Sequence, residues 1–199
     1  MKKEVLGTGI KKIAAGYLFL HITFSLGVVD LLPDWAGYLL MLQGIGMIGE
    51  WRESALLLKS IGRILMGLEV LKWAGSFLGI ALEVELLTVF MCMIDLYFHF
   101  QLLTEIAEIG RETGPGYWKK ICRMRTAKTV LSTAMAVVTL LPVPHIVWNG
   151  YHLVRDWLMP GLAVIFLLLA LWIFFTLRAL ASNLLLEGEI SNQPENVIS

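Results

Sequence analysis

The chain has 199 residues, of which 57% are hydrophobic and only 16% are charged. Its mean hydropathy of +0.73 is well above that of soluble domains, which are typically about 45–50% apolar and 25% charged. Sixteen basic and sixteen acidic residues give a net charge of +0, so nothing favours nucleic-acid binding. The two cysteines are too few for a disulfide framework. This composition excludes disordered, fibrous and disulfide-stabilised classes and predicts a small integral membrane protein.

Six apolar windows follow one another along the chain. A membrane-spanning helix needs about 20 apolar residues, because each residue adds about 1.5 Å and the hydrocarbon core is about 30 Å thick. The windows are residues 13–29, 33–49, 61–82, 84–103, 129–141 and 159–181. The second and the fifth are short. The expected fold is an all-α integral membrane protein with six transmembrane helices in three antiparallel hairpins.

Lysine and arginine residues gather in the connections on one side of these windows. Fourteen of the sixteen bases lie before the first window, in or beside the second connection, in the fourth connection, or near the end of the last window. On the opposite side Arg155 is the only base, and Lys72 lies inside a window. Because short cytoplasmic loops carry the excess of Lys and Arg, both termini are predicted to be cytoplasmic. The expected location is the bacterial cytoplasmic membrane.

Two cytoplasmic segments differ in composition from the windows. Residues 117–128 mix aromatic, apolar and basic side chains, which predicts either an interfacial helix that binds anionic lipids or a basic topology anchor with no further role. Residues 187–199 carry three glutamates, no base and one proline, which predicts a disordered acidic tail after a single bundle of residues 1–186. A protein partner or a second copy of the chain are further candidate contacts.

Four ionisable residues lie inside the third and fourth windows, where a charged group costs about 2.5–3.5 kcal/mol on insertion scales. Glu69 and Lys72 are three residues apart and share one face of their helix. Asp95 and His99 are four residues apart and do the same. If the hairpin turns near residues 83–84, Lys72 lies level with Asp95. The spacing therefore predicts a four-residue network near the midplane that contains a Lys72–Asp95 ion pair.

This network has two interpretations. As a functional site it is a proton or cation relay, or a substrate contact, because histidine titrates near neutrality and charged groups inside membranes mark such pathways. As a structural feature it is a closed ion pair that joins two helices, with attraction offsetting desolvation. If the chain instead turns at residues 75–79, Lys72 lies at the outer surface and extends its ammonium group into water.

Other residues predict contacts between helices or with a ligand. With a turn near residues 31–33, His21 lies level with Gln43, and a hydrogen bond between the two side chains is available. Gly37 and Gly44 share one face of the second window and permit the close approach of another helix.

The connection between the fifth and sixth windows gathers aromatic and polar side chains. These are His145, Trp148, Asn149, Tyr151, His152 and Asp156. They predict either the wall of an outward ligand site or the ordinary aromatic belt at headgroup level. The spacing of the histidines matches no zinc signature, so no metal is expected. The sequence also lacks HExxH, GxSxG and Walker A motifs, and we expect a protein that is not an enzyme and needs no cofactor.

The run GVVDLLPDWAGYLLMLQGIGMIG, residues 27–49, ends a span in a short Leu/Pro/Asp turn that is followed by Gly-Tyr. It resembles a hairpin of small, uncharacterised multi-pass membrane proteins of bacteria, and the resemblance covers about the first quarter of the chain. What it implies is the topology and no activity. In size and number of spans the chain is also similar to the substrate-binding subunits of vitamin-uptake transporters, but it lacks their longer first outward connection and their Ala-xxx-Ala motif.

Two functions are compatible with these features. The first is a membrane protein that binds or transports a small solute or ion through the midplane network of Glu69, Lys72, Asp95 and His99. The second is a non-enzymatic accessory or regulatory subunit whose basic segment and acidic tail contact a partner protein. The first function places the working residues inside the bundle, and the second places them on its cytoplasmic surface.

Overall fold

The computed structural model describes residues 2–21, 25–26, 29–30, 33–77, 85–113, 115–140 and 151–192. Six helices occur in these residues: α1 (Lys2–Phe19), α2 (Asp34–Gly49), α3 (Glu53–Phe77), α4 (Glu85–Thr113), α5 (Pro115–Leu140) and α6 (Tyr151–Asn192). Two short antiparallel strands, β1 (Ser25–Leu26) and β2 (Val29–Asp30), lie between α1 and α2. The expected all-α fold class is confirmed.

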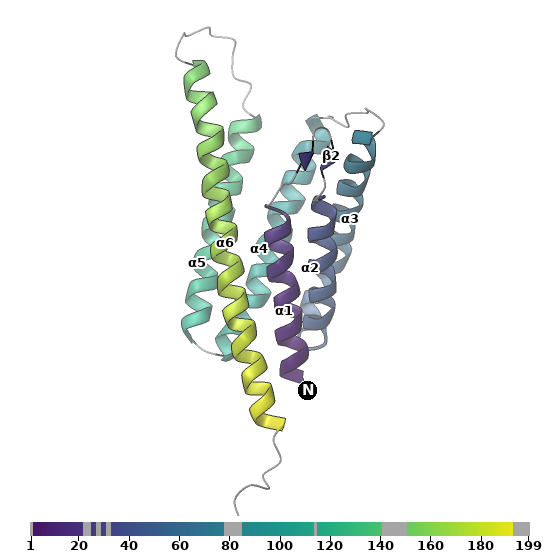
Figure 1. Ribbon diagram of the computed structural model, residues 1–199, viewed down its shortest axis with the longest axis vertical. Helices are drawn as coiled ribbons and strands as arrows, with labels where there is room; N and C mark the ends of the chain where they lie inside the picture. The colour runs from purple at the N-terminus through teal and green to yellow at the C-terminus, as the bar shows by residue number, and fades with distance from the viewer. Residues whose placement is uncertain are drawn as a thin grey trace, which may run out of the picture.

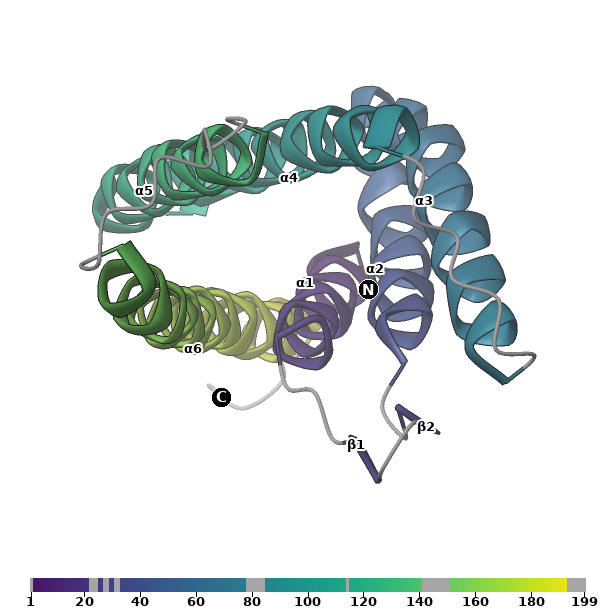
Figure 2. The same cartoon turned by 90° about the horizontal axis from the view of Figure 1, so that it is seen from above.

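The helices run alternately in opposite directions, so that the N-terminus and the C-terminal end of α6 lie at the same end of the molecule (Figure 1). We call this the terminal end and the opposite one the distal end. Seen along the helices, the molecule is an elongated ring in which each helix packs against the next one in sequence (Figure 2). The ring closes where α6 packs against α1.

Glycines bring α1 and α2 into close contact. A Cβ atom on Gly16 would lie 2.7 Å from the carbonyl oxygen of Gly37, and one on Gly44 would lie 2.5 Å from that of Gly9. Both distances are too short for a side chain, so the two backbones meet directly at these points. The predicted close approach at Gly37 and Gly44 is confirmed, with α1 as the partner helix.

The predicted register of the first hairpin is wrong. The chain reverses between β1 and β2, where Leu26 pairs with Val29, and not at residues 31–33. His21 and Gln43 consequently lie at different depths and do not bond to each other. Instead, Gln43 Oε1 accepts a hydrogen bond of 2.8 Å from the ammonium group of Lys12, and His21 Nδ1 lies 2.9 Å from the carbonyl oxygen of Tyr17.

The predicted register of α3 against α4 is also wrong. A Cβ atom on Gly62 would lie 3.0 Å from the ring of Phe98, which places these two residues at the same depth. Lys72 is almost three helical turns from Gly62 toward the distal end, whereas Asp95 is less than one turn from Phe98. The two charged groups are therefore about two turns apart, and the Lys72–Asp95 ion pair does not form. Residues 78–84, which include the predicted turn, lie outside the described part of the chain.

Two helices in the described residues are long and apolar enough to cross a membrane, Leu87–Thr113 within α4 and Pro160–Ile190 within α6. Only 22% of the apolar window of each is buried inside the molecule, so most of each window lies at least partly at the molecular surface. α1 and α2, with 18 and 16 residues, are about 27 and 24 Å long and fall short of a core of about 30 Å. The expected six-span topology is thus supported for two helices and not for the other four.

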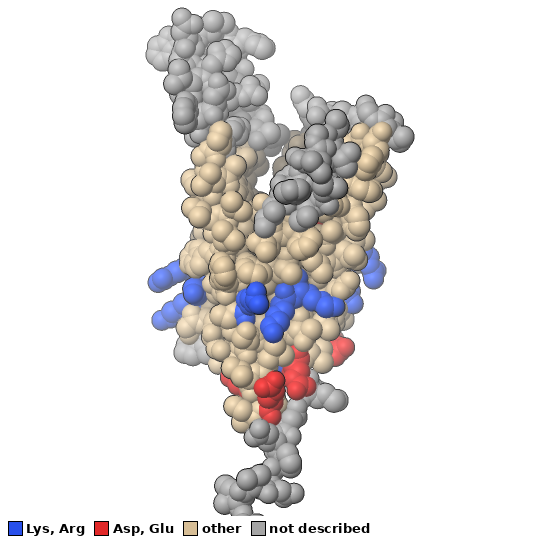
Figure 3. Space-filling model, viewed as in Figure 1, with Lys and Arg blue, Asp and Glu red and all other residues tan. Residues whose placement is uncertain are grey.

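Basic side chains are concentrated in the terminal half of the molecule. On the face drawn in Figure 3, Lys and Arg form a band across this half, and acidic side chains lie beyond the band toward the terminal end. The described surface on the distal side of the band is mainly uncharged on the same face. The gathering of bases at one end agrees with the count along the sequence.

The basic segment 117–128 does not form a separate interfacial helix, because α5 continues through it without a break. One face of the segment is buried in the bundle, since Ile121 and Met124 are 0% exposed and Lys128 is 6% exposed. Its other bases are partly or fully exposed. A contact of these exposed bases with anionic lipids remains a prediction.

The first residues of the predicted acidic tail are helical. α6 continues to Asn192 and so includes the first residues of the segment 187–199. Glu187 Oε2 lies 2.8 Å from the ammonium group of Lys3, and Gly188 packs against Glu4 of α1. These contacts with α1 keep the end of α6 helical. Residues 193–199 lie outside the described part of the chain.

Candidate functional site

A cavity of about 390 Å³ lies inside the ring, and its wall is formed by α2 to α6 and by the residues that directly follow α1. Its wall residues include, in chain order, His21, Tyr38, Glu69, Asp95, Lys128 and Phe166. These residues lie toward the distal ends of their helices, so the cavity occupies the distal half of the bundle. Polar side chains that converge on a cavity inside an apolar bundle make it the candidate binding site.

All four residues of the predicted midplane network line this cavity. The ion pairs form within each helix and not between the helices. The ammonium group of Lys72 donates to both carboxylate oxygens of Glu69, at 2.9 and 3.0 Å. On α4, His99 Nε2 lies 3.1 Å from Asp95 Oδ1. The cavity wall therefore carries two separate pairs in place of one four-residue network.

Hydrogen bonds connect Asp95 with the buried core. The hydroxyl of Tyr38 donates to Asp95 Oδ1 at 2.5 Å, and His99 Nδ1 lies 3.1 Å from the hydroxyl oxygen of Tyr17. When His99 donates from Nε2 to Asp95, its Nδ1 accepts from Tyr17. His99 is 3% exposed and Tyr17 is 0% exposed, whereas 33% of the Asp95 side chain is accessible. Residues of α1, α2 and α4 thus hold the Asp95 carboxylate at the cavity surface.

One oxygen of this carboxylate is free to accept further hydrogen bonds. Tyr38 and His99 both contact Oδ1. Across the part of the chain that the structure describes, Asp95 Oδ2 has no hydrogen-bond partner. Because Asp95 lines the cavity, Oδ2 is available to a donor group on a bound molecule.

Lys128 brings a buried positive charge to the same cavity. Its side chain is 6% exposed, and its ammonium nitrogen lies 5.9 Å from the ring centres of both Tyr17 and Phe166. Within the described residues no carboxylate lies within 4.0 Å of this nitrogen. A buried ammonium group without a paired anion is costly, and two aromatic faces offset only part of that cost. The cavity therefore presents an unpaired cation.

The cavity is closed on its terminal side by a packed apolar layer. Phe98, Leu102 and Ile106 follow one another along α4 toward the terminal end, and all three are 0% exposed. Met41 of α2 and Leu58 of α3 belong to the same core and are 0% and 1% exposed. These buried side chains lie between the cavity and the terminal end.

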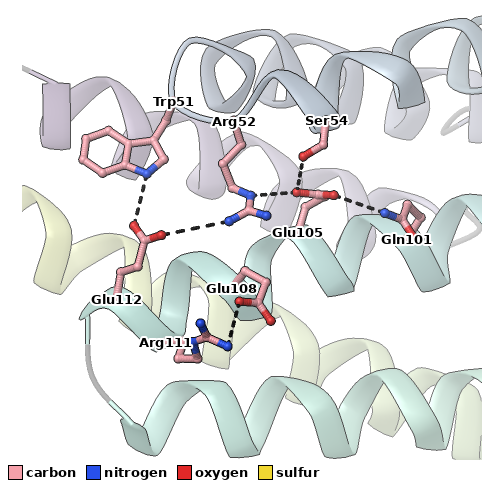
Figure 4. A network of polar contacts seen from close by, with 8 residues as sticks. All are labelled: Trp51, Arg52, Ser54, Gln101, Glu105, Glu108, Arg111 and Glu112. Atoms are coloured by element: carbon pink, nitrogen blue, oxygen red, sulfur yellow. Dashed lines mark hydrogen bonds and ion pairs between the residues drawn. The ribbon is translucent and has the colours of Figure 1, made fainter.

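A polar network closes the terminal end below this layer (Figure 4). The carboxylate of Glu105, which is 4% exposed, accepts from Arg52 Nε and Ser54 Oγ at 2.8 Å each and from Gln101 Nε2 at 3.1 Å. Arg52 also lies 4.0 Å from Glu112. The network joins the α2–α3 connection and the start of α3 to α4, and no pattern in the sequence predicted it.

Tyr17, Tyr38 and Lys128 are cavity or second-layer residues that the sequence interpretation missed. In the count of Lys and Arg along the sequence, Lys128 was assigned to a cytoplasmic connection. Its spacing from Ile121 and Met124 is nevertheless that of a buried helix face, and this signal was present in the sequence. The contacts of the two tyrosines cross from one helix to another, so no local pattern points to them.

The predicted outward ligand site falls largely outside the described residues. His145, Trp148 and Asn149 all lie outside the described part of the chain. Tyr151, His152 and Asp156 belong to the start of α6, but their side chains are outside the described part. The site remains a prediction. Among the described side chains, no group of three His, Cys, Asp or Glu residues has the arrangement of a metal site.

Comparisons of the chain with protein-family models, with curated proteins and with solved structures found no match.

Proposed function

We propose that this chain is a six-helix membrane protein that binds a small solute in its central cavity and transports it across the membrane. The observation that carries the proposal is the cavity itself. Its wall is built by α2 to α6 and the residues that follow α1, and it contains Asp95 Oδ2 and the ammonium group of Lys128, neither of which has a polar partner among the described residues. Charged groups inside a membrane are costly, and those that face a cavity usually belong to a substrate or ion pathway.

Two features of the surface support a location in the membrane. α4 and α6 carry long apolar windows of which only 22% is buried inside the molecule, as expected where they contact lipid. The band of Lys and Arg across the terminal half has the position expected at the cytoplasmic headgroups (Figure 3). In this orientation the distal end is the outer end, and α1 and α2 complete the spanning ring with the longer helices.

The same orientation suggests how a solute moves. The cavity lies in the outer half, and the apolar layer around Phe98 separates it from the cytoplasmic end. A solute is therefore bound from the outside in this conformation. Release to the cytoplasm requires a second conformation in which this layer and the bonds of Glu105 open, as in other proteins with alternating access.

The experiment that tests this function is native mass spectrometry of the protein gently extracted from its own membrane. It needs no assumed solute, because any bound small molecule, lipid or protein chain appears as added mass. We expect a stoichiometric small-molecule adduct on the wild-type protein. The adduct should be lost in Asp95→Asn and retained in Glu108→Gln, which removes a carboxylate of the same helix that pairs with the exposed Arg111.

Two results would contradict the proposal. The first is the absence of a small-molecule adduct from all three proteins together with a co-purifying protein chain, which would favour the accessory-subunit function. The second is an adduct that survives in Asp95→Asn unchanged, which would place binding elsewhere in the molecule.

A further inference from the structure

The two charged groups of the cavity that lack a full set of partners have opposite signs. Asp95 Oδ2 is open to a donor, and the ammonium group of Lys128 is open to an acceptor. Both residues line the same cavity. In the described residues they do not form an ion pair with each other within 4.0 Å, so space remains between them. Neither charge is neutralised by direct contact with the other.

A ligand with a single charge leaves one of these groups unsatisfied. An anion bound at Lys128 lies near the Asp95 carboxylate and is repelled by it, and a cation bound at Asp95 is repelled by Lys128. A molecule that carries both charges satisfies both groups at once. Buried charged groups strongly favour such pairing, because an unpaired charge in an apolar surrounding costs several kcal/mol.

We propose that the ligand of this cavity is a small zwitterion, with its cationic group at Asp95 Oδ2 and its anionic group at Lys128. The proposal rests on the function proposed above and assigns its solute class. Ser132 lies one helical turn from Lys128 on the cavity wall and provides a hydroxyl donor for the anionic group. Phe166 and Met91 supply apolar wall for an uncharged part of the ligand.

Cys92 provides a direct reporter of occupancy, because it is exposed and lines the cavity. The other cysteine, Cys122, lies in a separate apolar groove between α5 and α6 and is replaced by serine. Labelling of Cys92 by N-ethylmaleimide is then followed in nanodiscs. The probes are alanine, leucine and phenylalanine, each with its amide, which carries only the positive charge, and its des-amino acid, which carries only the negative charge.

We expect at least one amino acid to slow the labelling of Cys92 at concentrations about tenfold or more below those of its amide and its des-amino acid, since each lost charged contact weakens binding by about that factor. Lys128→Met should remove the advantage of the amino acid over its amide. Asp95→Asn should remove its advantage over the des-amino acid. Lys120→Met, which removes an exposed base of the same helix, should change neither.

The stability of the variants separates a binding role of Lys128 from a structural one. Since its buried ammonium group lacks a paired anion, Lys128→Met should keep or raise the melting temperature without ligand, and Lys128→Arg should retain the preference for amino acids. Equal protection by amides or by des-amino acids overturns the zwitterion but leaves the solute-binding function standing. Absence of protection by all nine compounds also overturns it. The native mass spectrum then decides the function independently.

Discussion

At the scale of single residues, the buried polar side chains are of two kinds. Some have all their hydrogen bonds made by neighbouring side chains, and others do not. Glu105 accepts three hydrogen bonds from neighbouring side chains and is 4% exposed, so it acts as a structural centre. Asp95 and Lys128 are also largely enclosed, but each retains capacity for a further partner. Buried polar groups with all their hydrogen bonds made stabilise one conformation. Buried polar groups that lack a partner favour the binding of a ligand that supplies it.

Replacing Glu105 tests whether a buried carboxylate with all its hydrogen bonds made stabilises the fold. Glu105→Ala leaves Arg52 without its closest anion, and we expect a loss of about 1.5–3 kcal/mol in the free energy of unfolding, the usual worth of a hydrogen bond to a charged group. Unfolding is followed by tryptophan fluorescence in a titration with denaturing detergent.

Glu108→Ala is the matched control, because its partner Arg111 is 65% exposed and such surface pairs contribute less than about 1 kcal/mol. Equal losses in the two variants would show that the Glu105 network does not stabilise the terminal end.

At the scale of elements, the helices meet in different ways. α1 and α2 meet backbone to backbone at pairs of glycines, which makes them one rigid unit. α3 meets its two neighbours through larger side chains, since Leu42 of α2 and Phe98 of α4 lie against Gly62. Close glycine contacts need a precise register, so a side chain added at one of them should displace the helices.

Two alanine substitutions test this contact. In Gly44→Ala the added Cβ meets the carbonyl oxygen of Gly9 at 2.5 Å, so the helices must move apart, at an expected cost of about 1–3 kcal/mol in unfolding free energy. In Gly67→Ala the added Cβ meets nothing within 4 Å, and the higher helix propensity of alanine should stabilise the protein by up to about 1 kcal/mol.

Thermal melting of both variants in the same detergent provides the comparison. If Gly44→Ala melts at or above the temperature of Gly67→Ala, the two helices are not held by the glycine contacts.

At the scale of the whole molecule, the arrangement is a ring of helices around a polar cavity, with bases at one end. Apolar side chains are exposed on α4 and α6, and some charged side chains of α3, α4 and α5 line the cavity. This arrangement suits a lipid surrounding, because lipid solvates an apolar exterior and leaves polar contacts to the interior.

The number of spans can be measured directly. In a chain with both native cysteines replaced, single cysteines are introduced at Glu50, Glu83 and Lys119 and are labelled with a membrane-impermeant reagent in intact cells. With six spans, Glu83→Cys is labelled, and Glu50→Cys and Lys119→Cys are protected until the cells are opened. If only α4 and α6 span the membrane, residues 50 and 83 lie on one side and residue 119 on the other.

Features that depend on local spacing in the sequence were predicted correctly, and contacts that depend on the position of a turn were not. The helical class, the glycine face at Gly37 and Gly44, and the intrahelical pairs Glu69–Lys72 and Asp95–His99 follow from local spacing. The predicted contacts Lys72–Asp95 and His21–Gln43 do not occur, because both depend on where a hairpin turns. An error of a few residues at a turn shifts the opposite helix by twice as many positions.

The sequence by itself determined the all-α class, the apolar windows of α4 and α6, and the charged residues that share one face of α3 and of α4, because these depend on composition and on the 3.6-residue period of a helix. Only the tertiary structure decided that Tyr38 and Lys128 line one cavity with Asp95 and His99, and that Tyr17 contacts His99 behind the cavity wall. Those residues come from four helices, and their meeting depends on helix register and on closure of the ring. Both are set by packing between distant parts of the chain, which local spacing does not encode.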